Sequence, residues 1–378
     1  MKFRVERDVL TDAVSWAARS LPSRPPLPVL AGLLVEAGDT GLTLSSFDYE
    51  VSARVEVGAE VSDHGRVLVS GRLLAEIVRS LPARPVDVVL EEAKVVLTCG
   101  SSRFALLTLP VEDYPTLPDL PAAAGTLPGP EFAAAVSSVA VAAGRDDTLP
   151  VLTGIRMEFE GDVLTMAATD RYRLAVREVP WTPLTPGTST IALVQARSLA
   201  ETARSLGDSD TVTLALTSQG AGDGLIGFEG EGGGARRRST TRLLDGEFPK
   251  YRALLPSESA AVATIDSAAF IDSVKRVALV AERNTPVRLG FGADELVLEA
   301  GTGDEAQATE SVAASFEGEP LTIAFNPQFL LDGLGAIDDP VARLSFTTST
   351  KPAVLTAGGD DAAASDYRYL LMPVRLSG

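Results

Sequence analysis

The segment from Gly222 to Gly227 has the GxGxxG spacing of a dinucleotide-binding loop. Such a loop holds a pyrophosphate only where it joins a buried strand to the N-terminus of a helix. Here Glu229, Glu231 and several further glycines follow. The carboxylates would repel phosphate, and the glycines would disfavour a helix. We therefore interpret this segment as a flexible hairpin.

Other groups that could do chemistry are sparse. The sole histidine, His64, lies in a turn sequence, Ser-Asp-His-Gly, without a second histidine or a cysteine pair to complete a transition-metal site. A serine-hydrolase triad would need this histidine, and the GxSxG nucleophile motif is absent. Most of the 51 Asp and Glu residues should be solvated surface groups. We expect an exposed His64, no metal or other cofactor, and no catalysis by this chain.

Two charged features have structural interpretations. Asp48 and Asp170 occupy the same place in two similar segments, just after predicted strands, where an aspartate commonly accepts backbone N–H bonds in a turn. Arg236, Arg237 and Arg238 follow a glycine loop within a predicted strand. We interpret these arginines as charges that protect an exposed sheet edge.

Composition limits the class of protein. A chain of 378 residues should contain two or three domains. Its net charge of −18 would repel nucleic acid unless the basic residues gather on one surface. The charged N-terminal residues do not look like a signal peptide, no apolar run is long enough to span a bilayer, and Cys99 is the single cysteine. We expect a cytoplasmic protein.

An internal repeat organises the chain. Residues 10–57 align without a gap with residues 132–179, giving 16 identities in 48 pairs, whereas composition alone predicts about one in fourteen. Leu-Pro-Val-Leu, for example, occurs in both. A third copy is fainter: Phe270 repeats Phe132 at an offset of 138 residues, and residues 295–298 take the place of a strand. The first two copies should therefore share one fold.

Each copy predicts the order strand, helix, strand hairpin, helix and further strands, which is an α+β arrangement. Hairpin turns are expected at Gly38-Asp39, Glu160-Gly161-Asp162 and Ala293-Asp294. Apolar spacing predicts helices at residues 7–20, 71–80, 131–145, 195–206, 268–283 and 326–335. These helices carry ten Lys or Arg against eight Asp or Glu, and the rest of the chain carries 23 against 43. Segregation of basic residues is thus possible.

Five segments spread from end to end of the chain carry a family resemblance. They are residues 1–7 (MKFRVER), 24–30 (RPPLPVL), 168–176 (ATDRYRLAV), 245–251 (DGEFPKY) and 369–376 (YLLMPVRL). Together they resemble the bacterial beta sliding clamps, the beta subunits of DNA polymerase III. The resemblance implies a non-catalytic clamp that encircles duplex DNA without sequence preference and makes the replicative polymerase processive.

The resemblance also implies three tandem domains, at residues 1–121, 127–252 and 253–378. Two chains would close head to tail into a ring, with helices lining the hole and antiparallel sheets outside. Basic helix positions could then face the duplex while the acidic outer surface repels it. Ring closure would bring Arg103 and Phe104 near Leu279 and Val280 of the other chain, with acidic residues at Asp304, Glu305 and Glu310 available for pairing.

By position, the resemblance assigns two further sites. Residues at or near the DNA backbone would be Arg24, Arg72, Arg145, Asp146, Pro150 and Val151. A mostly apolar pocket would capture short linear peptides of the polymerase alpha subunit, the clamp loader, translesion polymerases and repair proteins. Its residues would be Leu152, Thr169, Arg171, Tyr172, Arg173, Leu174, Pro249, Leu254, Leu370, Met372 and Pro373, with Phe329, Val374 and Arg375 at an adjoining subsite. Arg171 replaces a small residue of some clamps and would narrow the pocket or favour a carboxylate.

Two alternatives belong to other classes of protein. A repeat-built cytoplasmic enzyme acting on a small molecule should carry a cluster of unlike polar residues in one copy only, and the sequence has no such cluster. An extracellular adhesion array should carry an export signal, which the N-terminal residues do not resemble.

Overall fold

The computed structural model describes residues 1–217, 224–256, 258–281, 285–292, 294–301, 306–358 and 366–375. Within these ranges the chain forms six α-helices and many short strands, and the paired strands are antiparallel. The α+β prediction is therefore confirmed. None of the helices in the described ranges is long and apolar enough to cross a membrane.

The chain divides into two compact units, each built on one large sheet. Unit 1 comprises residues 1–133, 181–188 and 198–243, and unit 2 comprises residues 134–180, 189–197 and 244–378. Helices α3 (Gly129–Ala140) and α4 (Ala196–Leu206) cross the boundaries between these ranges. Because the division passes through the middle third of the chain, the three predicted domain boundaries stay a prediction.

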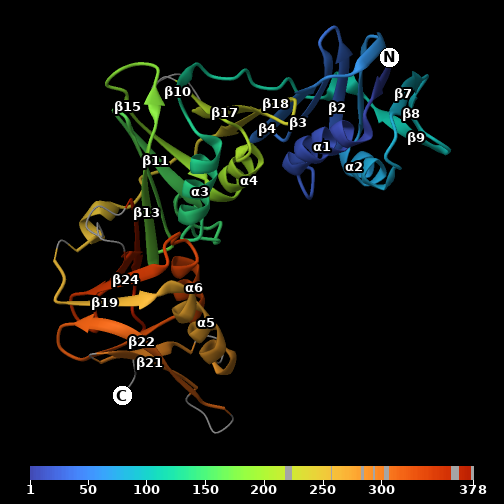
Figure 1. The fold of residues 1–378 in the computed structure, drawn as a ribbon. Coiled ribbons are helices and arrows are strands. Elements are labelled where there is room, and N and C mark those ends of the chain that lie inside the picture. Colours follow the sequence, from blue (N-terminus) through green and yellow to red (C-terminus); the bar gives the residue numbers. More distant parts are fainter. Residues whose placement is uncertain are drawn as a thin grey trace. The chain divides into compact units, whose positions relative to one another are not determined.

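Unit 1 contains helices α1 (Arg7–Ala17) and α2 (Gly71–Ser80), which pack against each other beside the sheet (Figure 1). Along the sheet its strands are β14 (Thr182–Pro183), β10 (Ala123–Leu127), β16 (Val212–Leu216), β17 (Leu225–Gly232), β18 (Ala235–Arg242), β4 (Val51–Val57), β3 (Gly41–Phe47), β2 (Gly32–Gly38), β6 (Gly65–Ser70), β9 (Ser102–Leu109), β8 (Lys94–Cys99), β7 (Val86–Glu91), β1 (Lys2–Val5) and β5 (Glu60–Asp63). The helices bury one apolar face each, as the spacing of Leu10, Val14 and Leu74, Val78 predicts.

Unit 2 contains helices α5 (Ser267–Val277) and α6 (Pro327–Leu334), which also pack together (Figure 1). Along the sheet its strands are β15 (Ser189–Gln195), β11 (Gly154–Glu160), β12 (Val163–Thr169), β13 (Arg173–Pro180), β26 (Tyr367–Leu371), β25 (Ala353–Ala357), β24 (Val341–Phe346), β19 (Ala261–Asp266), β22 (Ala308–Glu317), β21 (Glu295–Ala300), β20 (Val287–Phe291) and β23 (Leu321–Phe325). Side chains of Asp266 and Asn326 cap the two helices.

The repeat is visible in the strand pairing. Three meanders, β2–β3–β4, β11–β12–β13 and β20–β21–β22, have the same antiparallel order. The last strand of the first meander pairs with β18, and the last strand of the second pairs with β26. In both cases the partner strand comes from a much later part of the chain, so each meander is extended by a strand of the following repeat.

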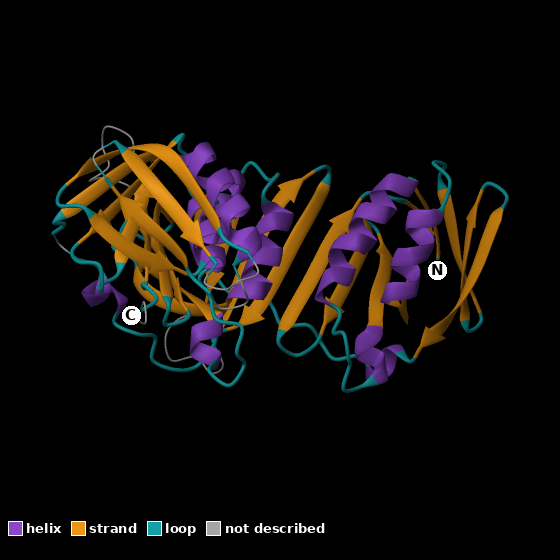
Figure 2. Cartoon of the chain, turned by 90° about the horizontal axis from the view of Figure 1, so that it is seen from below, coloured by secondary structure: helices purple, strands orange, loops and turns teal. Residues whose placement is uncertain are grey.

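The helix predictions are confirmed to within a few residues. Helix α2 covers the predicted range 71–80, and α4 and α6 begin one residue later than predicted. Predicted helix 7–20 is an α-helix to Ala17 and a 3₁₀ turn to Ser20. Predicted helix 131–145 is too long at its C-terminal end, because α3 stops at Ala140. Figure 2 shows the helices lying over strands in the unit that carries the N-terminus.

Several local predictions are confirmed as well. The first two predicted hairpin turns join β2 to β3 and β11 to β12. Strands β20 and β21 also pair, although Ala293 of the third predicted turn lies outside the described residues. His64 is an exposed residue between β5 and β6, with Nε2 3.2 Å from Asp39 Oδ1. In the GxGxxG segment Gly222 lies outside the described residues, and the end of the segment continues as strand β17, which leaves no helix N-terminus for a pyrophosphate.

The interpretation of the three consecutive arginines as edge charges is wrong. Strand β18, which carries them, is paired on both sides, with β17 and with β4. Arg237 is buried, and its Nη2 lies 2.5 Å from Asp12 Oδ2 on α1. Arg236 and Arg238 both pair with Glu229 across the strand pair. These cations hold the middle of the unit 1 sheet and its helix together.

Candidate docking and nucleic-acid sites

The turn at residues 170–173, called here the Asp170 turn, presents several of the predicted peptide-binding residues. Asp170 Oδ1 accepts hydrogen bonds from the backbone N–H groups of Tyr172, at 3.0 Å, and Arg173, at 3.1 Å. Arg171 has φ of 79°, a left-handed backbone conformation that is uncommon for a residue with a side chain. Thr169 is buried beside the turn and donates to the carbonyl of Arg173 at 2.7 Å. The turn therefore has a single, well-supported backbone path.

Arg173 is a buried cation with partners on three sides. Its Nε donates to Asp170 Oδ2 at 3.0 Å, and its Nη1 donates to Asp332 Oδ2 at 2.5 Å and to the Tyr369 hydroxyl at 3.4 Å. The guanidinium carbon lies 4.2 Å from the centre of the Phe329 ring. Burial alone would lower the pKa of Arg173, but these neighbours outweigh it and raise that pKa. Arg173 thus fixes β13 against α6 and β26.

Beneath this turn lies a small apolar cluster on the sheet of unit 2. The cluster comprises Ala167, Leu174, Val176, Leu193, Phe248, Tyr251 and Leu370, with Val151, Leu244 and Leu255 packed against it. Leu174 and Leu370 are directly opposite each other on β13 and β26. The segment after Leu244 covers the cluster, because Phe248 and Tyr251 are both buried in it and pack edge to face at 6.2 Å. The cluster gives the surface a rigid apolar floor.

Exposed apolar side chains surround this floor. Tyr172 is 58% exposed, Leu254 52%, Met372 42% and Val374 37%, and we call these four residues the docking surface. The tail that carries Met372 and Val374 is bound through its backbone: Met372 N donates to the carbonyl of Tyr172 at 2.9 Å, and Val374 N donates to the carbonyl of Ala324 at 2.8 Å. Apolar groups of this size held in the open by a fixed backbone are typical of binding sites.

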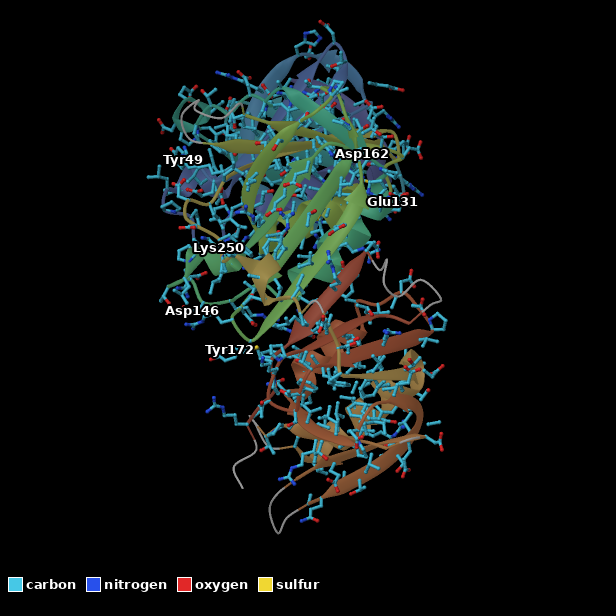
Figure 3. All side chains as sticks on the ribbon, turned by 90° about the vertical axis from the view of Figure 1, so that its left-hand side faces the viewer. Tyr49, Glu131, Asp146, Asp162, Tyr172 and Lys250 are labelled. Carbon is cyan, nitrogen blue, oxygen red and sulfur yellow. The ribbon has the colours of Figure 1, made fainter. Side chains whose placement is uncertain are left out.

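The other predicted peptide-binding residues lie at varied places around this surface. Phe329 is half-buried, and its ring stacks on Tyr172 with centroids 6.5 Å apart. Leu152 and Pro373 are half-buried, and Pro249 is exposed. Arg171 is exposed and influences Asp146, whose pKa is lowered first by hydrogen bonds from Thr148 and then by the charge of Arg171. Tyr172 and Asp146 are both labelled in Figure 3, with Lys250 of the covering segment.

Arg375 belongs to a different environment. It lines a cavity of about 470 Å³ together with Arg288 of β20 and Glu299 of β21. Because Arg288 is paired with Ala324 and Ala324 accepts the bond from Val374, the tail reaches this cavity directly from the docking surface.

Sequence reasoning missed two residues that shape the site, Asp332 and Tyr369. Both hold Arg173, and Tyr369 also donates to the carbonyl of Phe329 at 2.9 Å. Only weak sequence signals pointed to them: Tyr369 begins the segment 369–376 that resembles the clamp family, and Asp332 lies in the predicted helix 326–335. Partners 159 and 196 residues away in the sequence carry no local signature.

The residues predicted near DNA fall into two groups. In unit 1, Arg24 and Arg72 are exposed, and Arg72 Nη2 donates to the carbonyl of Pro22 at 3.0 Å, which places α2 beside the loop that carries Arg24. In unit 2, Arg145, Asp146 and Pro150 are exposed. Val151, in contrast, is half-buried against the apolar cluster and contacts Gly246. These assignments stay predictions.

The residues predicted at a dimer interface are divided between the two units, with Arg103 and Phe104 in unit 1 and Leu279 and Val280 in unit 2. Leu279, at 84%, is the most exposed large apolar residue in the described chain, and Val280 and Phe104 are half-buried. Arg103 Nη2 lies 3.5 Å from Glu91 Oε2. Asp304 and Glu305 lie outside the described residues. Glu310 is paired within its own chain, with Arg276 and with Ser273, and its pKa is lowered to about 2 by Arg276 first and Ser273 second.

Comparisons with known proteins cover the whole chain. Family models of the DNA polymerase III beta subunit match it in order: the N-terminal domain at residues 1–118, the central domain at residues 126–250 and the C-terminal domain at residues 252–375. The beta sliding clamp of Streptomyces coelicolor is 62% identical over 100% of both chains.

Solved structures agree. The DNA polymerase sliding clamp of Bacillus subtilis superposes with a TM-score of 0.88 at 25% identity over 100% of both chains. The Pseudomonas aeruginosa sliding clamp, solved bound to griselimycin, gives 0.87 at 27% identity over 100% of both chains. These relatives do not support a small-molecule enzyme. The chain belongs to the bacterial beta sliding clamp family, the non-catalytic processivity subunits of DNA polymerase III.

Proposed function

We propose that two copies of this chain close head to tail into a ring around duplex DNA and that the docking surface of unit 2 tethers replication and repair proteins to it. The observation that carries the ring is the repeated strand pairing. Strand β4 is completed by β18, and β13 by β26, so two of the three meanders end on a strand of the next repeat. The third meander ends on β22, whose residues 308–313 have no such partner strand among the described residues.

Strand β9 is the counterpart of β18 and β26 in the first repeat. Residues 102–107 of β9 pair only with β8, and residues 308–313 of β22 pair only with β21, among the residues that the structure describes. Open strand edges favour pairing with another strand. Phe104 and the 84%-exposed Leu279 would also become buried if β9 of one copy met β22 of another.

The repeat fixes the register of this contact. Val55 of β4 is opposite Arg237 of β18. By position in the hairpins, Glu310 of β22 takes the place of Val55, and Phe104 of β9 takes the place of Arg237. Ala105 of one chain should therefore be opposite Thr309 of the other. Both are exposed.

A cysteine pair tests this register. Ala105→Cys with Thr309→Cys should give a covalent dimer under mild oxidation, because facing strand residues lie within disulfide reach. The control pairs Ala105→Cys with Ser311→Cys, which is displaced by two residues. Equal cross-linking of both pairs, or light scattering that finds only monomer at micromolar concentration, counts against the ring.

The docking function rests on four exposed apolar side chains above a rigid apolar floor. Such a surface suits short linear peptides that insert a few apolar side chains. We propose that the polymerase alpha subunit, the clamp loader, translesion polymerases and repair proteins all use it through such peptides. Griselimycin, bound by the relative from Pseudomonas aeruginosa, is a ready probe, and its displacement of a polymerase peptide would locate both on one surface.

We propose that Arg24, Arg72 and Arg145 contact phosphates. Each is exposed and lies on a helix or on a loop next to one. Replacement of any one by Ala should weaken DNA binding equally for all sequences and reduce the slope of log K against log salt by about one.

A processivity assay on primed circular DNA with the clamp loader and the cognate polymerase tests the whole function. Added clamp should lengthen the products made in a single binding event, on circular but not on short linear templates, because a ring slides off free ends. Product lengths that are the same with and without the protein would overturn the proposal.

A further inference from the structure

Glu158 of β11 is a buried carboxylate on the sheet of unit 2, with 4% of its surface exposed. Each of its oxygens has a guanidinium partner. Arg156 Nε donates to Oε1 at 2.5 Å from the same strand, and Arg252 Nη2 lies 2.5 Å from Oε2. A buried charge is costly unless it is paired, so Glu158 depends on these two cations.

Arg252 lies on the segment that forms one wall of the docking surface. The 3₁₀ turn Tyr251–Leu254 places Arg252 two residues before the exposed Leu254. The backbone hydrogen bonds found in this turn are local: Tyr251 N donates to Pro249 O at 2.7 Å, and Ala253 N donates to Lys250 O at 3.3 Å. Side chains therefore carry the attachment of this wall to the sheet, through Tyr251 in the apolar cluster and Arg252 on Glu158.

The three side chains are electrostatically coupled. The Arg252 guanidinium carbon lies 5.6 Å from the centre of the Tyr251 ring. Burial first, and then the charge of Glu158, raises the pKa of Tyr251 to about 12. Burial would lower the pKa of Arg252, but Tyr251 and Glu158 outweigh it and raise that pKa. Tyr251 is therefore neutral at physiological pH, and Glu158 is the charge that holds Arg252 there.

The first repeat lacks this arrangement. Glu36 aligns with Glu158, but Leu34 stands at the position of Arg156. When Tyr114-Pro115 is aligned with Phe248-Pro249, Pro118 stands at the position of Arg252. Glu36 is only half-buried. The first two copies thus share the carboxylate, whereas the two cations occur only in the second of them, which carries Tyr172 of the docking surface.

We infer that the Arg252–Glu158 ion pair is a positioning device that holds the Leu254 wall in its binding geometry and so sets the affinity of the docking surface for peptides. The inference rests on the proposed docking function. On this inference both residues act through Leu254 rather than by touching the peptide, because Glu158 is buried and Arg252 is paired with it. Preorganising a wall in this way reduces the ordering cost of binding.

The test measures peptide affinity and local opening in the full-length protein. The probe is a fluorescent peptide from the clamp-binding region of the organism's own polymerase alpha subunit, followed by anisotropy. Arg252→Met, which keeps the apolar stem, and Glu158→Gln should each weaken binding about five- to tenfold. The double variant should be no weaker than the weaker single variant, and Arg252→Lys should recover part of the loss.

Lys250→Ala is the matched control, because it removes one positive charge from the same segment at an exposed position (Figure 3). Its affinity should stay within twofold of wild type. Amide hydrogen exchange supplies a second readout: residues 249–255 should exchange faster in Arg252→Met and Glu158→Gln, with unchanged exchange in β20 and β21.

Three results would overturn the inference: wild-type affinity in both single variants, losses that multiply in the double variant, or faster exchange spread over the whole unit. A wild-type protein that does not bind the peptide would instead contradict the proposed docking function. The exchange measurement would then still decide whether the ion pair holds the wall.

Discussion

The turn at residues 48–51 of unit 1, the Asp48 turn, and the Asp170 turn of unit 2 are two copies of one backbone with different side chains around it. Asp48 Oδ1 accepts from the N–H groups of Glu50 and Val51, as Asp170 does from the two equivalent residues. Tyr49 has φ of 76° and Arg171 has φ of 79°. The predicted role of both aspartates in a turn is confirmed.

The floors under the two turns differ. On β4 and β18 the facing residues are Ser52 and Thr240, whose hydroxyls are 2.5 Å apart and buried. The equivalent pair in unit 2 is Leu174 and Leu370. A hydrogen-bonded hydroxyl pair closes the first floor to apolar ligands, whereas two leucines extend the apolar cluster to the surface. A copied backbone thus becomes a candidate binding site by exchange of a few side chains.

The largest effect should follow removal of the tail, because its counterpart beside the Asp48 turn is polar: there Arg242 N donates to the carbonyl of Glu50, as Met372 N does to that of Tyr172. Deleting residues 372–378 takes away the exposed Met372 and Val374 and the bond from Met372 N to Tyr172. We expect at least a hundredfold loss of peptide affinity and no polymerase stimulation, because two of the four apolar anchors disappear. Anisotropy and a primer-extension assay measure both. Light scattering should still find the dimer, and its loss would make the tail structural.

Exchanging the floors should have the next largest effect. Leu174→Ser with Leu370→Thr copies the unit 1 pair into unit 2 and should weaken peptide binding about ten- to fiftyfold, with a loss of about 2–5 kcal/mol in the free energy of unfolding. Titration calorimetry and urea unfolding measure these. The reverse change, Ser52→Leu with Thr240→Leu, should create no peptide site, because Glu50 and Arg242 stand there at the positions of Tyr172 and Met372. Peptide binding gained by that variant would contradict the comparison.

Replacement of Asp170 by Ala should lower the free energy of unfolding more than replacement of Asp48. Asp48→Ala removes two backbone hydrogen bonds and should lower the free energy of unfolding by about 1–2 kcal/mol. Asp170→Ala also takes a partner from buried Arg173, and about 2–4 kcal/mol is expected. Urea unfolding monitored by circular dichroism compares them. Equal losses would mean that Asp332 and Tyr369 alone satisfy Arg173.

The smallest effect concerns Tyr114, which takes the place of Phe248 when Pro115 is aligned with Pro249. Burial raises the pKa of Tyr114 to about 12, opposed by its hydrogen bond from Phe47 N. Its contribution to stability is complete below pH 10, the unfolded value, and is lost as the pH rises to about 12. Tyr114→Phe should remove one late step from the absorbance titration at 295 nm and change stability at pH 7 by about 1 kcal/mol. An unchanged titration would refute the raised pKa of Tyr114.

Sequence patterns were sufficient for features that depend on neighbours in the chain. The helices, the first two hairpins and the two aspartate turns follow from spacing within about ten residues, as α2 illustrates. Sequence patterns failed where a residue's partner is remote in the sequence. Arg237 looked like an edge charge because nothing nearby indicates that β18 pairs with β4, some 180 residues earlier. The partners of Arg173 on α6 and β26 were missed for the same reason.

The pairing of each meander with a later strand has a consequence for how the protein is made. When β4 leaves the ribosome, its partner β18 has not yet been translated. Strand β13 likewise emerges long before its partner β26, which lies near the end of the sequence. For most of synthesis the nascent chain therefore exposes open strand edges, which are prone to non-native association. The unit 1 sheet is complete once β18 has emerged, whereas the unit 2 sheet reaches its final extent only when β26 and the adjoining docking surface emerge, so a product truncated before β26 lacks both.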